Sequence, residues 1–138
     1  LEDISITGSM ISNYVKKKII NNPVKKQYGR DQIASLIFIA IAKSVLSLDN
    51  IHMMFEIQRQ TYDNATAYNY FCSEFELILH HVFELDQANA KTGAAHNVKK
   101  EHGTFSNEKT MLRNMIITVA HKIYLDRYFS LLRDEDTI

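Results

Sequence analysis

Basic side chains gather in one short segment of the chain, from Ser9 to Arg30. The segment spans 22 residues with six positive charges and no acid, although the 138-residue chain has 16 basic and 16 acidic residues in total. The six are Lys16, Lys17, Lys18, Lys25, Lys26 and Arg30. Clustered ammonium and guanidinium groups attract phosphates, so these residues predict the binding of a nucleic acid.

The first half of this segment, Ser9–Lys18, has two faces if it is helical, and Thr7 is the expected N-cap before it. At 3.6 residues per turn, five polar residues fall on one side, at i, i+3, i+4, i+7 and i+8. This cationic face consists of Ser9, Ser12, Asn13, Lys16 and Lys17. The apolar face consists of Met10, Ile11, Tyr14, Val15 and Ile19. The polar side chains suit base edges and phosphates in a major groove, and Tyr14 either reaches a phosphate or is buried with its apolar neighbours.

A short basic loop follows this helix. Pro23 has no N–H and disfavours helical geometry at the residue before it, so the helix must end by about Asn21 or Asn22. Residues 24–28 then alternate in the manner of a small β-hairpin or an extended loop, with successive side chains pointing to opposite sides. We expect Lys25 and Lys26 of this loop, together with Arg30, to hold a phosphate backbone.

The order of these features resembles the winged helix-turn-helix of MerR-type bacterial regulators. In that family a recognition helix with an aromatic pair is followed by a turn with two aliphatic residues and a proline, by a basic wing, and by a tyrosine that opens the next helix. The matching residues are Asn13-Tyr14, Ile19-Ile20, Pro23, Tyr28 and the helix start Ser47-Leu48-Asp49-Asn50-Ile51. The chain departs from the pattern at Ser12 and Lys18, where the family has arginine and glycine, and its wing is shorter.

The segment is also similar to an uncharacterised bacterial family, mostly from Gram-positive species, that is defined as a domain of unknown function and predicted to be MerR-like. These resemblances imply an all-α protein, in which a MerR-like winged helix-turn-helix precedes a helical C-terminal domain. The first helix of the motif is expected upstream of Thr7, outside this sequence. They also imply a transcription regulator that binds double-stranded DNA through the Ser9–Lys18 recognition helix, as a homodimer whose symmetry sets the half-site spacing.

Charge and composition divide the chain and limit its class. Residues 1–60 carry 8 basic and 5 acidic residues (net +3), and residues 61–138 carry 8 and 11 (net −3). We therefore expect a DNA-binding domain over 1–60 and a dimerisation or effector domain over 61–138. One proline and four glycines disfavour an all-β fold. A single cysteine and the lack of any apolar run near the roughly 18 residues of a membrane span predict a cytoplasmic protein without membrane segments.

Start signals and apolar periodicity predict four further helices. They are expected to begin at Gly29 or Asp31, at Ser47, at Asp63 or Asn64, and at Asn107 or Glu108. The first of these is apolar around most of its circumference, which predicts a central helix packed on two sides. Residues 87–106 lack periodicity and predict an exposed, mobile loop. The end of the last helix, near Arg133, is also apolar nearly all round, so we expect burial on several sides, with a dimer interface as one explanation.

No residue pattern in the chain predicts an enzyme, a cofactor or a metal site. The sequence has no glycine-rich phosphate loop, nucleophile elbow or two-cysteine metal pair. His80 and His81 would point about 100° apart on a helix, so they cannot hold one metal ion together. An aromatic cluster in the C-terminal half either lines a pocket for a small-molecule effector or belongs to the core. It comprises Tyr70, Phe71, Phe75, Tyr124 and Tyr128.

The interpretation that fits most of these features is a DNA-binding transcription regulator. One alternative is a helical protein–protein interaction or adaptor module that kept the motif but lost DNA binding. Strong affinity for duplex DNA would exclude it. The other alternative is a ligand-binding helical bundle, which would show a deep apolar pocket between the last two helices.

Overall fold

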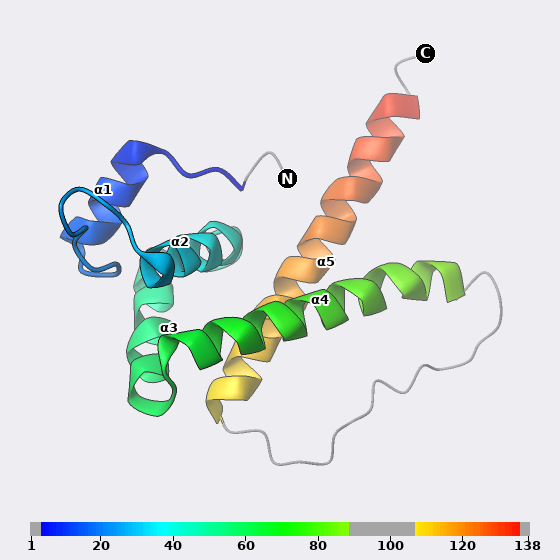
Figure 1. Cartoon of the computed structure of the whole chain (residues 1–138). Helices are drawn as coiled ribbons and strands as arrows, with labels where there is room; N and C mark the ends of the chain where they lie inside the picture. The colour runs from blue at the N-terminus through cyan, green and yellow to red at the C-terminus, as the bar shows by residue number, and fades with distance from the viewer. Residues whose placement is uncertain (1–3, 89–106, 136–138) are drawn as a thin grey trace. The chain divides into compact units, whose positions relative to one another are not determined.

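The computed structural model describes residues 4–88 and 107–135, and the regular secondary structure within them is helical apart from one isolated β-bridge. Five helices follow one another in these residues (Figure 1). They are α1 (Gly8–Lys16), α2 (Arg30–Ala42), α3 (Leu48–Thr61), α4 (Asn64–Ala88) and α5 (Asn107–Glu135). The all-α prediction is confirmed. Of the loop predicted at 87–106, residues 87 and 88 belong to α4 and the remainder lies outside the described residues.

Two compact units divide the chain, Leu1–Tyr70 (unit 1) and Phe71–Ile138 (unit 2). Unit 1 contains α1, α2, α3 and the first turns of α4, whereas unit 2 contains the rest of α4 and α5. The basic segment therefore lies wholly in unit 1. The roles assigned to the two halves from the sequence, DNA binding over residues 1–60 and dimerisation or effector binding over 61–138, stay predictions.

Polar side chains begin three helices at residues that the sequence predicts. Thr7 precedes α1, and its Oγ1 accepts the N–H of the third residue after it at 3.2 Å. Ser47 Oγ does the same before α3 at 3.2 Å, and Asp63 Oδ1 before α4 at 2.7 Å. Each bond satisfies an N–H that the start of a helix leaves without a helical partner, so these short polar residues fix where the helices begin.

Helix α1 ends at Lys16, two residues earlier than predicted. The Lys18 N–H donates to the Val15 carbonyl at 3.0 Å, and the Ile19 N–H donates to the Tyr14 carbonyl at 2.9 Å. These two bonds form a Schellman motif, which stops a helix by placing one residue in the left-handed region. That residue is Lys18, with φ of 60°. Tyr14 and Ile19 are both buried, as in the apolar pair that accompanies this motif.

Helix α2 is only partly covered. The buried apolar residues of unit 1 are Tyr14, Ile19, Ile20, Ile39, Ala40, Ala42, Ile51 and Met54. Ile37 lies two positions before the fully buried Ile39, or about 200° around the helix, and it is 42% exposed. Ile33, one turn earlier on the same side, is 50% exposed. The prediction that α2 packs on two sides is wrong at Ile33 and Ile37, because the buried positions of the helix are confined to Ile39, Ala40 and Ala42.

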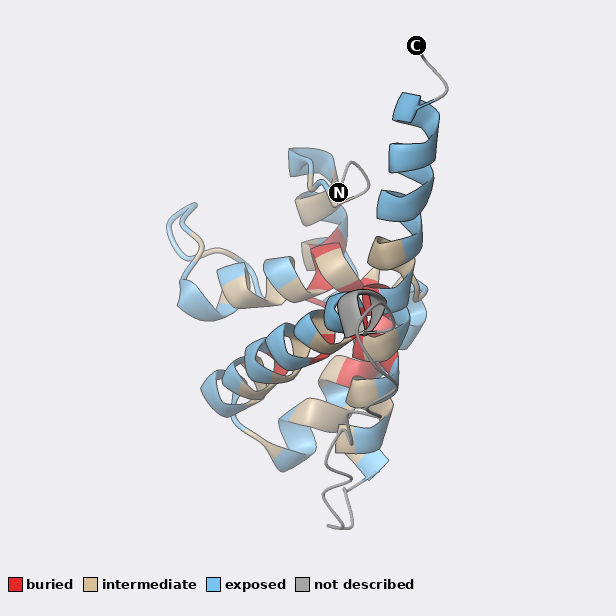
Figure 2. Cartoon of the chain, turned by 90° about the vertical axis from the view of Figure 1, so that its right-hand side faces the viewer, coloured by how far each residue is buried: buried red, intermediate tan, exposed pale blue. Residues whose placement is uncertain are grey.

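Unit 2 is a pair of long helices joined along part of their length. Its buried residues are Phe71, Ile78 and Val82 on α4 and Met115, Ile116, Val119 and Ala120 on α5. The rings of Phe83 on α4 and Tyr124 on α5 lie 5.8 Å apart and mark the end of this contact. Beyond Tyr124 every described residue of α5 is exposed (Figure 2). The predicted burial of this end is absent from the single chain, and the dimer interface that the sequence offers as an explanation stays a prediction.

Candidate nucleic-acid interface

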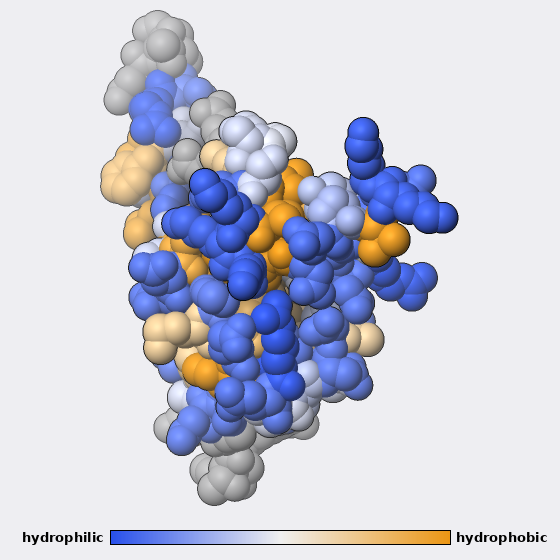
Figure 3. Space-filling view, turned by 90° about the vertical axis from the view of Figure 1, so that its left-hand side faces the viewer, coloured by the Kyte–Doolittle hydropathy of each residue, from blue (hydrophilic) through white to orange (hydrophobic). Residues whose placement is uncertain are grey.

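The cationic face of α1 is exposed. All five of its residues, Ser9, Ser12, Asn13, Lys16 and Lys17, are open to solvent. Ser12 Oγ donates to the Gly8 carbonyl at 3.1 Å, so its hydroxyl donor is used within the helix and its oxygen can still accept a hydrogen bond. In Figure 3, which looks onto the α1 side of the chain, hydrophilic side chains cover most of the visible surface. Helix α1 therefore presents donors, acceptors and two ammonium groups together.

Tyr14 is not part of this surface. Its side chain is 3% exposed, and burial raises the pKa of its phenol above the ordinary value. The phenol belongs to the apolar face that packs inside unit 1. Of the two interpretations open from the sequence, burial holds, and the assignment of Tyr14 to a phosphate contact is corrected here.

The basic loop contains a two-residue hairpin. Val24 and Gln27 form an antiparallel bridge with N–H to carbonyl distances of 3.1 and 2.9 Å. Between them Lys25 and Lys26 have φ of 51° and 61°, as in a type I′ turn. The hairpin is one of the two forms that the sequence predicts. The strict alternation predicted for residues 24–28 is wrong, because the two lysines are the turn itself and are not strand residues.

Three lysines of the basic segment have a backbone conformation that side chains disfavour. In the described part of the chain, Lys18, Lys25 and Lys26 are the non-glycine residues with positive φ. An L-residue in the left-handed region costs roughly 1–2 kcal/mol relative to the right-handed one. Asparagine and glycine usually occupy both sites of a type I′ turn, and glycine usually follows a Schellman end. Lysine at all three positions is a costly choice for folding alone.

Arg30 is the sixth basic residue of the segment, and it is exposed at the first position of α2. A positive charge there opposes the helix dipole, which typically costs 0.3–1 kcal/mol. Asp31 follows it and restores a favourable charge in the first turn. The arrangement keeps a guanidinium at the outer surface of unit 1 although the helix start would favour an acid.

Two side chains from other helices hold the ends of the loop. Gln32 of α2 donates through Nε2 to the carbonyls of Asn21 (3.0 Å) and Asn22 (2.9 Å), and its Oε1 accepts the Gly29 N–H. Arg59 of α3 donates through Nη2 to the Ile19 carbonyl at 3.3 Å.

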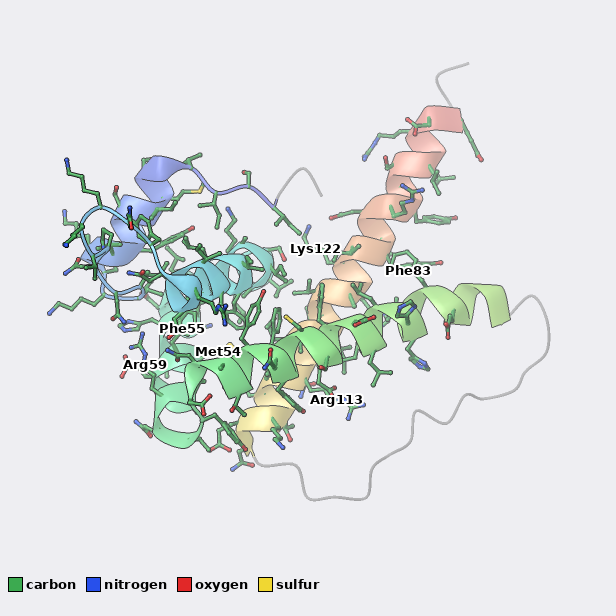
Figure 4. The ribbon with its side chains drawn as sticks, viewed as in Figure 1. Met54, Phe55, Arg59, Phe83, Arg113 and Lys122 are labelled. Atoms are coloured by element: carbon green, nitrogen blue, oxygen red, sulfur yellow. The ribbon has the colours of Figure 1, made fainter. Side chains whose placement is uncertain are left out.

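The Arg59 guanidinium is itself fixed in place. It pairs with Glu56 Oε1 at 3.0 Å and lies 6.0 Å from the ring centre of Phe55 (Figure 4). Sequence reasoning did not single out Gln32, Arg59 or the conformation of Lys18. For Gln32 a signal exists, since a glutamine three residues after a helix cap is the capping-box pattern. For Arg59 no local signal exists, because its partner lies forty positions away along the chain.

Four of the five aromatic residues predicted to line a ligand pocket lie in unit 2, where they are spread along its two helices. Phe71 and Phe75 stack at 5.7 Å on α4, and Phe71 is buried. Tyr124 contacts Phe83, which is twelve residues beyond Phe71 and hence about 18 Å further along the helix. Tyr128 is half exposed and packs on Phe129. Tyr70 belongs to unit 1. Within unit 2 the structure thus places the other four residues in a stacked pair on α4, a helix–helix contact and a surface pair.

Metal ligation and membrane insertion find no support in the described ranges. No three side chains of histidine, cysteine, aspartate or glutamate within residues 4–88 and 107–135 come together as metal ligands do. No helix in these ranges is both long and apolar enough to span a bilayer.

Comparison with known proteins gives one match. The family described as a domain of unknown function (DUF1836) matches residues 1–71, which include the whole basic segment and α1, α2 and α3. No curated protein and no solved structure matches the chain. Because the family match covers 71 of 138 residues, just over half, the chain belongs to the DUF1836 family.

Proposed function

We propose that this chain is a DNA-binding transcription regulator of the MerR-like winged helix-turn-helix type. Helix α1 would enter the major groove with Ser9, Ser12 and Asn13 toward the base edges and Lys16 and Lys17 toward phosphates. The hairpin would hold the backbone beside it. Together the exposed face of α1 and the hairpin would form one recognition surface, the basic surface of unit 1.

The observation that carries this proposal is lysine at three left-handed positions, Lys18, Lys25 and Lys26. Glycine at these positions would fold at lower cost, so lysine must contribute something that glycine lacks. What it adds is a charge on a long, flexible arm. The ammonium groups of Lys18, at the end of α1, and of Lys25 and Lys26, at the turn, have no acidic residue in the basic segment. Phosphate groups are anions that lysine side chains commonly bind.

The proposal is tested by anisotropy of a labelled random-sequence duplex titrated at several salt concentrations. Six phosphate contacts, from Lys16, Lys17, Lys18, Lys25, Lys26 and Arg30, would give a log–log slope of about −5.4, at about 0.9 per contact. Glutamate at both Lys16 and Lys17 should abolish binding at about 0.1 M salt, because it removes two contacts and adds two repulsive charges. Both side chains are exposed, so the thermal unfolding of the variant should stay close to that of the unaltered chain.

A matched control is available in the same chain. Lys99 and Lys100 are another adjacent lysine pair, outside the basic segment, and their replacement by glutamate makes the same change in net charge. That control should keep most of its affinity. Equal loss in both double variants would mean that net charge alone governs binding, and salt-independent binding by the unaltered chain would refute the assignment of DNA as the partner.

The exposed end of α5 supports homodimerisation as part of this proposal. Five large apolar side chains lie there with 38–52% of their surface exposed. They are Leu125, Tyr128, Phe129, Leu131 and Leu132. Exposed apolar side chains in such density are typical of a surface that another chain covers. We propose a second copy of the same chain as that partner.

Charge complementarity gives this dimer a direction. Residues 122–135 hold three basic and three acidic residues, with Lys122 near one end and Glu135 at the other. In an antiparallel pair centred between Tyr128 and Phe129, Leu125 faces Leu132 of the second copy and Lys122 faces its Glu135. Parallel pairing would align like charges. A dimer would offer two copies of the basic surface to one duplex, as recognition of paired half-sites requires.

A further inference from the structure

The hairpin of the basic surface has little stability of its own. One bridge with two hydrogen bonds holds it, its turn residues have positive φ, and Val24 beside the turn is 72% exposed. Isolated two-stranded hairpins are at best marginally stable in water. Whatever position Lys25 and Lys26 keep relative to α1 must therefore come from contacts at the base of the loop.

Gln32 supplies that contact on both sides of the hairpin. Its two amide N–H groups donate to Asn21 and Asn22 at 3.0 and 2.9 Å, and its carbonyl oxygen accepts from Gly29. The residues before and after the hairpin are thus tied to a single side chain on α2. Because both N–H groups are used, Gln32 has no donor left for a base or a phosphate.

We infer that Gln32 is a positioning residue for the DNA contact of the hairpin, a role that rests on the proposed function. It touches no DNA itself. It closes the loop over Asn21–Gly29, so that the ammonium groups of Lys25 and Lys26 stay at one distance from the face of α1. Without this closure the two lysines sample many positions, and the cost of ordering them on each binding event removes most of their contribution.

The matched pair of variants is Gln32→Met and Gln58→Met. Both remove a glutamine amide of similar size, and Gln58 also bonds to backbone, through Nε2 to the Tyr62 carbonyl at 2.7 Å, away from the basic segment. Two quantities are measured on each full-length variant. One is the salt slope of binding to random duplex DNA, and the other is hydrogen exchange of the Val24 and Gln27 amides without DNA.

Gln32→Met should make the slope less negative by about 1.8, the equivalent of two phosphate contacts, and should speed the hydrogen exchange of both amides. Gln58→Met should leave both quantities unchanged. A Gln32→Glu variant guards against loss of folding, since it keeps the acceptor for Gly29 and a favourable charge at the start of α2 while removing both donors. It should speed the exchange in the same way.

The outcomes separate this inference from the function on which it rests. An unchanged slope in Gln32→Met overturns the positioning role, whether or not the two amides exchange faster. An equal loss of slope in Gln58→Met also overturns it, because the effect would then be general. Salt-independent binding by the unaltered chain overturns the proposed function and this inference together, whereas a normal slope there confines any failure to Gln32.

Discussion

Replacing Lys18 by glycine should stabilise the chain and weaken its binding to DNA at the same time. Lys18 has φ of 60° at the end of α1, and this left-handed conformation costs a residue with a side chain roughly 1–2 kcal/mol. Glycine avoids this cost but loses about 0.5–1 kcal/mol through its greater freedom in the unfolded chain. The midpoints of the two ranges, about 1.5 and about 0.75 kcal/mol, leave a net gain of about 0.75 kcal/mol. For a chain of this length, that gain corresponds to a rise of about 2–4 °C in the midpoint of thermal unfolding.

Lys17→Gly is the matched control for this prediction. Lys17 is the neighbouring residue and loses the same charge, but its φ is −78°, where a side chain meets no strain. Glycine there should lower the midpoint, because only the entropy term remains. Circular dichroism melts of the two variants and the unaltered chain provide the comparison. If Lys18→Gly lowers the midpoint as much as Lys17→Gly does, the argument from backbone strain is refuted.

Two further predictions concern α5 and the start of α4. Glutamate at both Leu125 and Leu132 should convert a dimer to a monomer in sedimentation velocity without loss of helix. The control Leu77→Glu, which changes an exposed leucine on α4, should leave the dimer intact. A double variant that stays dimeric would contradict the assigned interface. The Thr66 N–H lowers the pKa of Asp63 below 3.8, so its stabilising effect is present above that pH and is lost as pH falls through the lowered pKa. The midpoint difference between the unaltered chain and Asp63→Asn, which keeps an acceptor but no charge, should therefore shrink in acid, and a difference independent of pH would contradict this.

The helices of this fold could be predicted closely from the sequence, and their starts best of all. Thr7, Ser47 and Asp63 act through bonds to residues three positions away, so the signal and its partner stand together in the chain. The end of α1 was predicted two residues late because lysine is not the residue expected to stop a helix in the left-handed region. The turn at Lys25 and Lys26 was not predicted for the same reason, since lysine is rare at turn positions with positive φ.

Burial could be predicted less well than helices. An apolar residue gives the same sequence pattern whether its side chain is covered by another helix of the chain, by a second copy or by no described element. This is why the sequence predicts burial for the end of α5 near Leu132 without deciding between the core and a dimer interface, and why it predicts cover for Ile33 and Ile37, which are exposed. For the candidate site, the exposed face of α1 follows from periodicity, but the contacts of Gln32 and Arg59 depend on folding and cannot be seen in local sequence.

The paired lysines at the tip of the hairpin make the chain sensitive to the salts around it. Lys25 and Lys26 are neighbours in a turn held by two hydrogen bonds, so their mutual repulsion acts on a weak element. Any multivalent anion that sits between them offsets this repulsion and so favours the folded turn. Thermal midpoints measured in phosphate buffer should therefore exceed those measured in chloride at equal ionic strength. Stabilities of variants in this segment are comparable only when the anion is the same.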